Sequence, residues 1–229
     1  MTNYYVRKVL EREQVDLIQN LLKHAEEHNL WHDGLNSGGG TSSTKSNKEL
    51  SDLQMSKTIN DCIMQSLDTD REFLAFTAAK STNVNIISKS ESGNYYNPHF
   101  DNWDNGDFST TVFLSDPNTY EGGELCLLLG TDEEKQFKPE AGWAVTYPTG
   151  IMHRVNRVLS GTRYVSVFWT KSKIKNIVMR NMNYQLELII QNLEKNSDSI
   201  HHTDCKAALK DPLFIARNVQ NEIIRHYGE

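Results

Sequence analysis

Short β-rich segments follow one another between residues 84 and 170, and Gly, Pro, Asn and Asp residues separate them. Such runs of β-branched and aromatic residues, bounded by turn residues, are typical of β-strands. Several short strands in succession predict an antiparallel β-sandwich or jelly roll and argue against a parallel sheet. The predicted strands are residues 84–87, 110–114, 125–129, 143–147 and 163–170.

Two segments with helical spacing of apolar residues precede this β region. After a short strand-like start at residues 4–6, residues 11–28 place Leu17, Ile18, Leu21, Leu22 and Ala25 on one helix face. A second helix is expected at residues 51–67, where Ser51 and Gln54 have the spacing of a capping box. Both helices are amphipathic, so we expect them to support the β core.

Helical spacing returns after Lys173, and a last helix is expected near Pro212. The sequence therefore predicts a mainly β fold with flanking helices: a domain at residues 1–170, with its β core at 84–170, and a helical extension at 171–229. This extension either packs on the core or mediates a homodimer, since its apolar side suits both. That side contains Ile174, Ile177, Val178, Met182, Leu186, Ile189 and Leu193.

Composition limits the class of protein. Apolar residues make up 38% and charged residues 24%, as in ordinary soluble domains, so the chain should fold. The formal charge of −6 lacks the basic footprint of a duplex-binding protein and makes nucleic acid an unfavourable partner. Cys62, Cys126 and Cys205 form no C-x-x-C pair, and neither a signal peptide nor a membrane-spanning stretch is visible. We therefore expect a cytoplasmic protein.

Residues 33–48 contain the triple glycine Gly38-Gly39-Gly40 in a polar setting. The spacing of a phosphate-binding loop is missing, and no apolar strand precedes the glycines. A mobile loop is therefore expected here, and we hypothesise that it forms part of a lid over substrate.

His99-Phe100-Asp101 is the first candidate for chemistry. On an extended segment, residues two apart point the same way, so an imidazole and a carboxylate can converge on one ion. With a distant second histidine they make a facial triad, which suits non-haem Fe(II) because three metal positions stay open. His202-Thr203-Asp204 has the same spacing, but no predicted strand fixes it, and we interpret His201, His202 and Asp204 as solvated surface residues.

His153 is the expected third ligand, and Arg163 lies ten positions later at the head of an apolar strand. A histidine that bonds a backbone carbonyl is the alternative for His153. The buried guanidinium needs an anionic partner, and its planar fork matches a carboxylate. That partner is either a bound ligand or a protein acid, for which Glu124 and Glu140 are the candidates.

Taken in order, these residues and their surroundings resemble the prolyl 4-hydroxylase-like branch of the Fe(II)/2-oxoglutarate-dependent oxygenases, which includes the PKHD-type hydroxylases. The likeness runs from about Val84 to Trp169. It rests on Tyr96-Asn97-Pro98-His99-Phe100-Asp101, on Thr111-Val112-Phe113-Leu114-Ser115-Asp116 with Tyr120-Glu121-Gly122-Gly123-Glu124-Leu125, on Pro139-Glu140-Ala141-Gly142, on Tyr147-Pro148, and on His153, Val158, Gly161, Arg163 and Trp169.

The resemblance implies a double-stranded β-helix, or jelly roll, with Fe(II) at His99, Asp101 and His153 and 2-oxoglutarate held by Arg163. It implies a dioxygenase that uses molecular oxygen, hydroxylates a peptidyl substrate, and releases succinate and carbon dioxide. A prolyl residue is the first candidate for the hydroxylated group, and ascorbate is a further candidate ligand. Ser90 stands where the family often has a tyrosine that binds the co-substrate, so this contact is shorter or absent. Arg157 replaces a usual proline and adds positive charge near the mouth.

Tyr96, Trp103 and Trp143 are candidates for lining the pocket, with plain core or rim positions as the alternative. Tyr96 joins Ser90 and Arg163 as a predicted co-substrate contact. Other functions remain open. The substrate can be a free amino acid or another small molecule, the protein can be a non-catalytic jelly-roll that binds metal or ligand, or a different divalent metal can serve a hydrolase or isomerase. Arg163 favours the oxygenase because it implies a dicarboxylate co-substrate.

Overall fold

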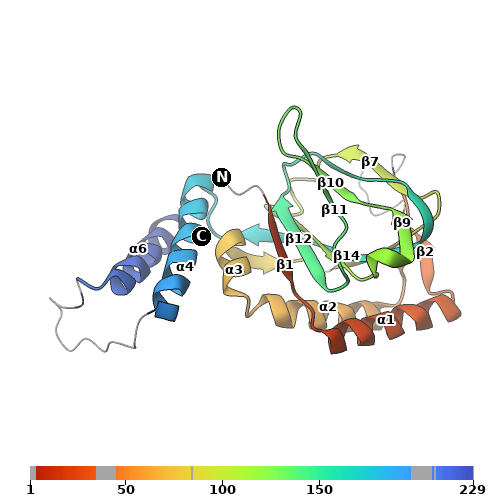
Figure 1. The fold of residues 1–229 in the computed structure, drawn as a ribbon, viewed down its shortest axis with the longest axis horizontal. Coiled ribbons are helices and arrows are strands. Elements are labelled where there is room, and N and C mark those ends of the chain that lie inside the picture. Colours follow the sequence, from red (N-terminus) through yellow and green to blue (C-terminus); the bar gives the residue numbers. More distant parts are fainter. Residues whose placement is uncertain (1–3, 35–44, 84, 197–207, 209, 229) are drawn as a thin grey trace.

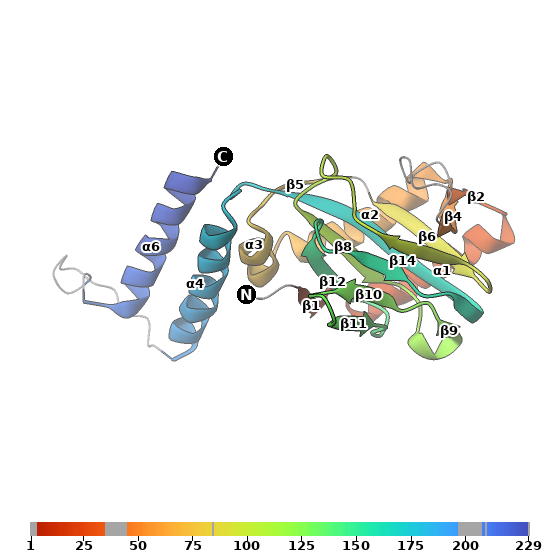
Figure 2. The ribbon, with the colours of Figure 1, turned by 90° about the horizontal axis from the view of Figure 1, so that it is seen from above.

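The computed structural model describes residues 4–34, 45–83, 85–196, 208 and 210–228. Two β-sheets face each other, two helices lie along the outer side of one sheet, and a helical hairpin extends from one end (Figures 1 and 2). This arrangement confirms the mainly β fold with flanking helices that the sequence predicts. Among the described helices, none combines the length and the apolar character that a membrane span requires.

The larger sheet has nine strands, in the order β1-β12-β8-β14-β6-β4-β2, and β5 and β9 also pair with β14. Every pairing in it is antiparallel. Its strands are β1 (Tyr5–Lys8), β2 (Trp31–Asp33), β4 (Lys48–Leu50), β5 (Ala79–Thr82), β6 (Ile86–Glu91), β8 (Phe108–Phe113), β9 (Tyr120–Gly122), β12 (Trp143–Pro148) and β14 (Val158–Ser172).

The smaller sheet has five strands, in the order β11-β10-β13-β7-β3, and is also antiparallel. Its strands are β3 (Lys45–Ser46), β7 (Tyr95–His99), β10 (Leu125–Leu128), β11 (Glu134–Phe137) and β13 (His153–Val155), and the short helix η3 (Pro117–Thr119) precedes β9. The sequence pattern missed β7 and β13. Both are short and polar, so they lack the apolar runs by which a strand is recognised.

Residues 33–48 are only partly the loop that the sequence predicts. β2 ends at Asp33, while β3 and β4 occupy residues 45–46 and 48–50. These short strands are too brief to show a period of two in the sequence. Residues 35–44, which contain the triple glycine and most of the hypothetical lid at residues 33–48, lie outside the described part of the chain.

Helices α1 (Arg12–Glu27) and α2 (Leu53–Leu67) cover the outer face of the larger sheet, as predicted. Their apolar faces form one core with that face of the sheet, whereas a second core fills the space between the two sheets. Ile18, Leu22, Ile59 and Ile63 belong to the first core, and Phe113, Leu127 and Val145 belong to the second.

The capping box predicted from Ser51 is wrong. Asp52 is the N-cap of α2, and its carboxylate accepts a hydrogen bond from the Met55 backbone N–H at 2.8 Å. Ser51 instead donates its hydroxyl to the Leu30 carbonyl at 2.9 Å, which ties the helix start to the loop after α1. Both residue types favour an N-cap, so only the path of the chain distinguishes them.

We expect Asp52→Ala to lower the free energy of unfolding by about 1 kcal/mol, the usual cost of losing an N-cap side chain. Ser51→Ala is the matched control, and it should cost less because its hydrogen bond is exposed. Urea unfolding of the three proteins, followed by circular dichroism, measures both changes. A larger loss for Ser51→Ala than for Asp52→Ala would contradict this assignment of the cap.

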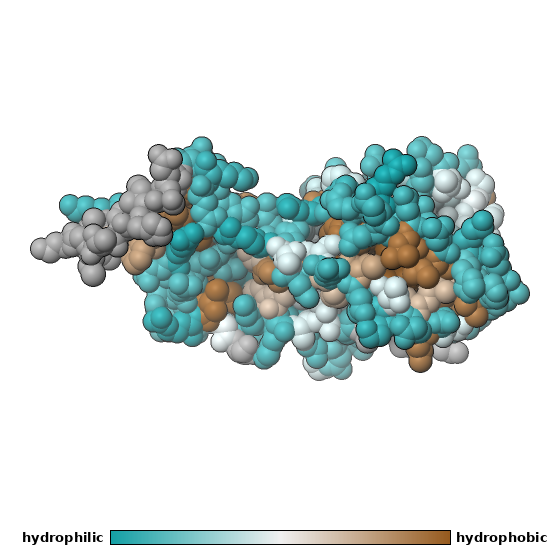
Figure 3. Space-filling model, turned by 90° about the horizontal axis from the view of Figure 1, so that it is seen from below, coloured by the Kyte–Doolittle hydropathy of each residue, from teal (hydrophilic) through white to brown (hydrophobic). Residues whose placement is uncertain are grey.

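The C-terminal hairpin consists of α4 (Ile177–Asn196) and α6 (Pro212–Tyr227), and α4 contacts the short helix α3 (Arg71–Thr77). Polar groups and an aromatic pair make this contact: Asn183 Nδ2 donates to the Ala75 carbonyl at 3.0 Å, and an Arg71 nitrogen lies 2.8 Å from Glu187. The rings of Phe76 and Tyr184 meet edge to face, with centroids 5.3 Å apart. Figure 3 shows scattered hydrophobic surface at the hairpin end of the molecule, among hydrophilic surface. Many apolar residues of the hairpin stay exposed. They include Ile177, Val178, Met182, Ile189, Phe214, Ile215 and Val219.

Candidate active site

A cavity of about 340 Å³ lies between the two sheets. β7 and β13 of the smaller sheet supply one wall, and the inward-facing residues of β6, β8, β12 and β14 supply the other. Because side chains alternate along a strand, Arg163, Val165, Val167 and Trp169 of β14 all line this cavity. One long strand therefore places both an isolated cation and an indole ring in the same space.

His99, Asp101 and His153 meet in this cavity, with their ligand atoms within 4.8 Å of one another. The neighbouring strands β7 and β13 bring the two histidines together, since His153 is the register partner of His99. Each imidazole Nε2 lies 3.8 Å from an oxygen of Asp101: that of His99 from Oδ1 and that of His153 from Oδ2. The structure thus brings together the three ligands that the sequence predicts, although they span more than fifty positions of the chain.

Backbone hydrogen bonds orient both imidazoles. His99 Nδ1 lies 2.8 Å from the Asn97 carbonyl and His153 Nδ1 lies 3.0 Å from the Ile151 carbonyl. A carbonyl can only accept, so each Nδ1 carries the proton and each Nε2 keeps its lone pair for a metal. Burial and the neighbouring His153 lower the pKa of His99 to about 4, which keeps this imidazole neutral near pH 7. Neutral imidazoles and a carboxylate on one face suit Fe(II).

Asp101 is held by two donors. Ser109 Oγ donates a hydrogen bond to Asp101 Oδ2, and Trp169 Nε1 donates to the same oxygen at 3.0 Å. Ser109 was missed by sequence reasoning. A serine at an inward position of a fully buried strand is the signal that could have revealed it, because a buried hydroxyl needs a partner.

Arg163 is 3% exposed and faces the cavity. Burial lowers the pKa of its guanidinium, and its Nε has no hydrogen-bond partner in the described part of the chain. The Tyr120 hydroxyl is likewise buried without a described partner. Gly123, at φ +69°, lets the backbone approach the Arg163 side chain closely, since a Cβ at this position would lie 3.0 Å from Arg163 Cδ. A buried cation with free donor capacity is suited to an anionic ligand.

The protein acids considered as partners of Arg163 are engaged or exposed. Glu124 Oε2 accepts a hydrogen bond from Asn156 Nδ2 at 2.9 Å, and Glu140 is exposed. Within the described residues, no ion pair joins Arg163 to a carboxylate. The structural alternative of an internal ion pair is therefore wrong for Glu124 and Glu140.

The other predicted co-substrate contacts lie in the same cavity. Ser90 is buried on β6 and is the register partner of Arg163. Tyr96 stacks on His99, with ring centroids 3.6 Å apart and planes inclined by 18°. Both residues line the cavity.

Tyr147, which the sequence analysis used only as part of a motif, is buried in the cavity wall. Its ring lies 5.1 Å from that of His153. Burial, together with the nearby Asp101 carboxylate, raises its pKa well above the ordinary value, so the hydroxyl stays protonated and can donate. Its presence beside Thr111 on the neighbouring strand gives the wall two hydroxyl groups.

Two aromatic candidates do not line the cavity. Trp103 is 83% exposed on the loop after Asp101, and Trp143 is half-buried at the start of β12. Phe100, by contrast, lines the cavity and is still 54% exposed. Arg157, expected near the mouth, stacks over the Tyr95 ring at 4.5 Å.

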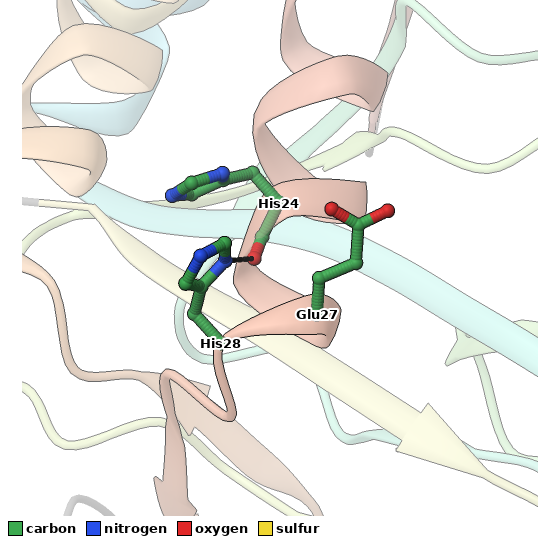
Figure 4. A group of neighbouring side chains, drawn as sticks. All are labelled: His24, Glu27 and His28. Atoms are coloured by element: carbon green, nitrogen blue, oxygen red, sulfur yellow. Dashed lines mark hydrogen bonds between the residues drawn. The ribbon is translucent and has the colours of Figure 1, made fainter.

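A second trio of potential ligands, His24, Glu27 and His28, lies at the end of α1 (Figure 4). All three side chains are exposed, and the Glu27 carboxylate points away from the two stacked imidazoles. His28 Nδ1 already bonds the His24 carbonyl at 3.0 Å. We interpret this trio as solvated surface. His201, His202 and Asp204 lie outside the described residues.

Comparison with known proteins places this site in a family. A model of the 2OG-Fe(II) oxygenase superfamily matches residues 83–171. A PKHD-type hydroxylase of Synechococcus sp. (strain CC9605) is 36% identical over 163 residues, which cover 69% of this chain and 73% of that protein. A PKHD-type hydroxylase of Aliarcobacter butzleri (strain RM4018) is 30% identical over 213 residues, or 87% of this chain and 91% of the other.

Solved structures show the same fold. A prolyl-4-hydroxylase of Pseudomonas putida superposes with a TM-score of 0.52 at 15% identity, over 74% of this chain and 92% of that chain. A prolyl hydroxylase of Trichoplax adhaerens, solved with a peptide fragment, gives 0.60 at 14% identity, over 75% and 84%. These likenesses identify the two facing sheets as a jelly roll. The chain belongs to the 2OG-Fe(II) oxygenase superfamily, among the PKHD-type hydroxylases, and is an oxidoreductase that uses Fe(II) and 2-oxoglutarate.

Proposed function

We propose that this oxygenase hydroxylates a residue of a peptide or protein, with Fe(II) bound by His99, Asp101 and His153. The observation that carries the proposal is Arg163, a buried guanidinium without an acid partner among the described residues, in the same cavity as this trio. A buried cation is unfavourable unless an anion meets it. A dicarboxylate that chelates the metal with one end and reaches Arg163 with the other satisfies this requirement.

The polar groups around Arg163 fit the distal carboxylate of 2-oxoglutarate. The guanidinium offers a fork of N–H donors, and the buried Tyr120 hydroxyl lies close to it. Ser90 has a short side chain, so its hydroxyl reaches less far into the cavity than a tyrosine would. We assign the missing donor to Tyr147 of β12, whose protonated side chain lines the same cavity.

Fe(II) with 2-oxoglutarate and oxygen supplies the oxidising power in this family, and the chain supplies binding and orientation. The two imidazoles and Asp101 would hold Fe(II), and a set of three protein ligands would leave metal positions open for co-substrate and oxygen. Val165 and Val167 line the cavity between Arg163 and Trp169 and present apolar surface there. Apolar surface beside a reactive centre disfavours water and so limits side reactions.

The residues at the mouth of the cavity favour a peptidyl substrate. Phe100 and Trp103, on the loop that follows β7, expose large aromatic surfaces beside the metal ligands. Asn102 and Asn105 of the same loop line the cavity and present amide groups. Exposed aromatic rings next to amides suit an extended peptide, above all one with proline rings, because rings stack and amides bond its backbone. Relatives are named PKHD-type hydroxylases, and one solved neighbour holds a peptide fragment.

Succinate formation tests the proposed function. Purified protein, loaded with Fe(II) under air and supplied with 2-oxoglutarate, is incubated with a panel of proline- and lysine-containing peptides and with free amino acids. Ascorbate is present in one arm and absent in the other, which shows whether it supports turnover. We expect succinate, and a product heavier by one oxygen in a peptide. A product found only among the free amino acids would contradict the peptidyl assignment.

We expect Phe100→Ala and Trp103→Ala each to raise the KM for the accepted peptide by about fivefold to tenfold, since a lost aromatic contact costs about 1 kcal/mol or more. Succinate formed in the absence of peptide should not change, because neither residue holds the co-substrate. Leu53→Ala on α2 is the matched control, because Leu53 is 85% exposed but distant from the cavity lining. An unchanged peptide KM in both aromatic variants would remove this loop from substrate binding.

A further inference from the structure

The two donors on Asp101 come from one cross-strand pair. Ser109 of β8 and Trp169 of β14 are register partners. Trp169 lines the cavity, and Ser109 lies on the same face of β8 as the cavity-lining residue Thr111. Ser109 Oγ and Trp169 Nε1 donate to the same carboxylate oxygen, Oδ2. A directly opposed pair keeps its side chains close together, so the spacing of these donors is built into the sheet.

These two hydrogen bonds distinguish the oxygens of Asp101. A carboxylate oxygen has two lone-pair directions, and two donors fill both of them on Oδ2. Oδ1 lies 3.8 Å from His99 Nε2 and accepts no hydrogen bond from the described residues. Oδ2 lies equally far from His153 Nε2, but its lone pairs are engaged by the two donors, so Oδ1 is the oxygen that keeps free lone pairs.

We propose that Ser109 and Trp169 are positioning residues that restrict Asp101 to binding the metal through Oδ1 alone. The proposal rests on Fe(II) binding at this site, as argued above. Octahedral iron that is held by two imidazoles and one carboxylate oxygen keeps three positions for 2-oxoglutarate and oxygen. A second carboxylate oxygen on the metal would take one of them. The pair thus keeps that position open for the co-substrates.

The surroundings of the pair support a role beyond packing. Ser109 is 1% exposed in a strand whose residues are all buried, and a buried hydroxyl is costly unless it is bonded. An alanine or valine would pack in the core at this position without the cost of burying a hydroxyl group. The hydroxyl has one described hydrogen-bond partner, which is a metal ligand. Partners that bond a metal ligand typically change metal affinity by about 10- to 100-fold.

Fe(II) titration of metal-free protein without oxygen tests the proposal independently of turnover. Ser109→Ala and Trp169→Phe each remove one donor and keep most of the volume of the side chain. We expect each to weaken Fe(II) binding by about tenfold, and the pair together by more. Ser109→Thr keeps the hydroxyl and should restore affinity to near that of the wild type. Trp143→Phe, the same exchange outside the cavity, is the matched control and should bind Fe(II) normally.

X-ray absorption of the Fe(II)-loaded proteins gives a second readout. We expect the variants without donors to show an added oxygen ligand from Asp101 and to bind 2-oxoglutarate more weakly, while the wild type and Trp143→Phe show neither change. Fe(II) affinity within twofold of the wild type in both single variants, with unaltered coordination, would overturn the proposal. If Trp169→Phe does not fold, the comparison of Fe(II) affinity between Ser109→Ala and Ser109→Thr tests the proposal by itself. If the wild type formed no succinate, the proposed hydroxylation would be wrong. The comparison of Fe(II) affinities would still test the role of Ser109 and Trp169.

Discussion

Replacement of Arg163 with methionine is expected to raise the KM for 2-oxoglutarate by about two orders of magnitude or more. Truncating one partner of a buried, hydrogen-bonded charge pair costs about 2–5 kcal/mol, and each 1.4 kcal/mol corresponds to about a factor of ten. Because Arg163 has no acid partner among the described residues, the co-substrate should receive the whole of this interaction. Initial rates of succinate formation against 2-oxoglutarate concentration measure the change.

Arg163→Met should not destabilise the ligand-free protein. Burial lowers the pKa of Arg163, which shows that its charge is poorly solvated in the folded state. Methionine removes that charge at similar volume, so the thermal midpoint of ligand-free Arg163→Met should equal or exceed that of the wild type. A clear fall in this midpoint would indicate an internal structural role for the guanidinium.

Two controls separate the charge of Arg163 from its shape. Arg163→Lys keeps a cation without the planar fork, and we expect an intermediate KM. Arg157→Met removes a guanidinium that stacks on Tyr95, and it should leave the KM for 2-oxoglutarate unchanged. A KM for Arg163→Met within threefold of the wild type would show that the co-substrate binds elsewhere.

Asp101→Ala is expected to reduce succinate formation by at least about a thousandfold. The substitution removes the anionic member of the trio and leaves two neutral imidazoles, which attract Fe(II) far less than the full set does. It also leaves the Ser109 hydroxyl and the Trp169 indole N–H without their acceptor. Fe(II) content after dialysis and turnover with excess Fe(II) measure affinity and activity separately.

Asp104→Ala is the matched control for Asp101, because it removes a carboxylate from the same loop at an exposed position. It should retain Fe(II) and activity. Turnover of Asp101→Ala at more than a tenth of the wild-type rate, under Fe(II) saturation, would exclude this carboxylate as a required ligand. Retention of Fe(II) together with lost turnover would instead assign Asp101 a role after metal binding.

Much of the jelly roll could be predicted because strands with apolar runs can be recognised from the local sequence. The predicted segments at 110–114 and 143–147 correspond to β8 and β12, which pair in the centre of the larger sheet. β7 and β13 could not be predicted in this way, since Asn97, Pro98 and Arg154 interrupt any apolar pattern. These two strands carry the histidines, so the elements that hold the metal ligands were the least visible ones.

The predicted site residues lie together in the structure where a motif combined several residues in order. His99, Asp101, His153 and Arg163 were all named from the sequence, and the structure places them in one cavity. Trp103 and Trp143 failed as lining candidates, because an aromatic residue near a motif gives no sign of the face on which its ring lies. Ser109 and Tyr147 were overlooked for the opposite reason: isolated hydroxyl residues in buried strands have no motif of their own.

The sequence by itself determined the class of fold and named the candidate metal ligands, because side-chain alternation and residue chemistry are local properties. The tertiary structure decided which of those side chains share a space. It assigned the two imidazole tautomers through backbone carbonyls, left Arg163 without an acid among the described residues, and directed both donors of a cross-strand pair to one oxygen of Asp101. These features depend on register and burial, which arise only when strands distant in the chain pack together.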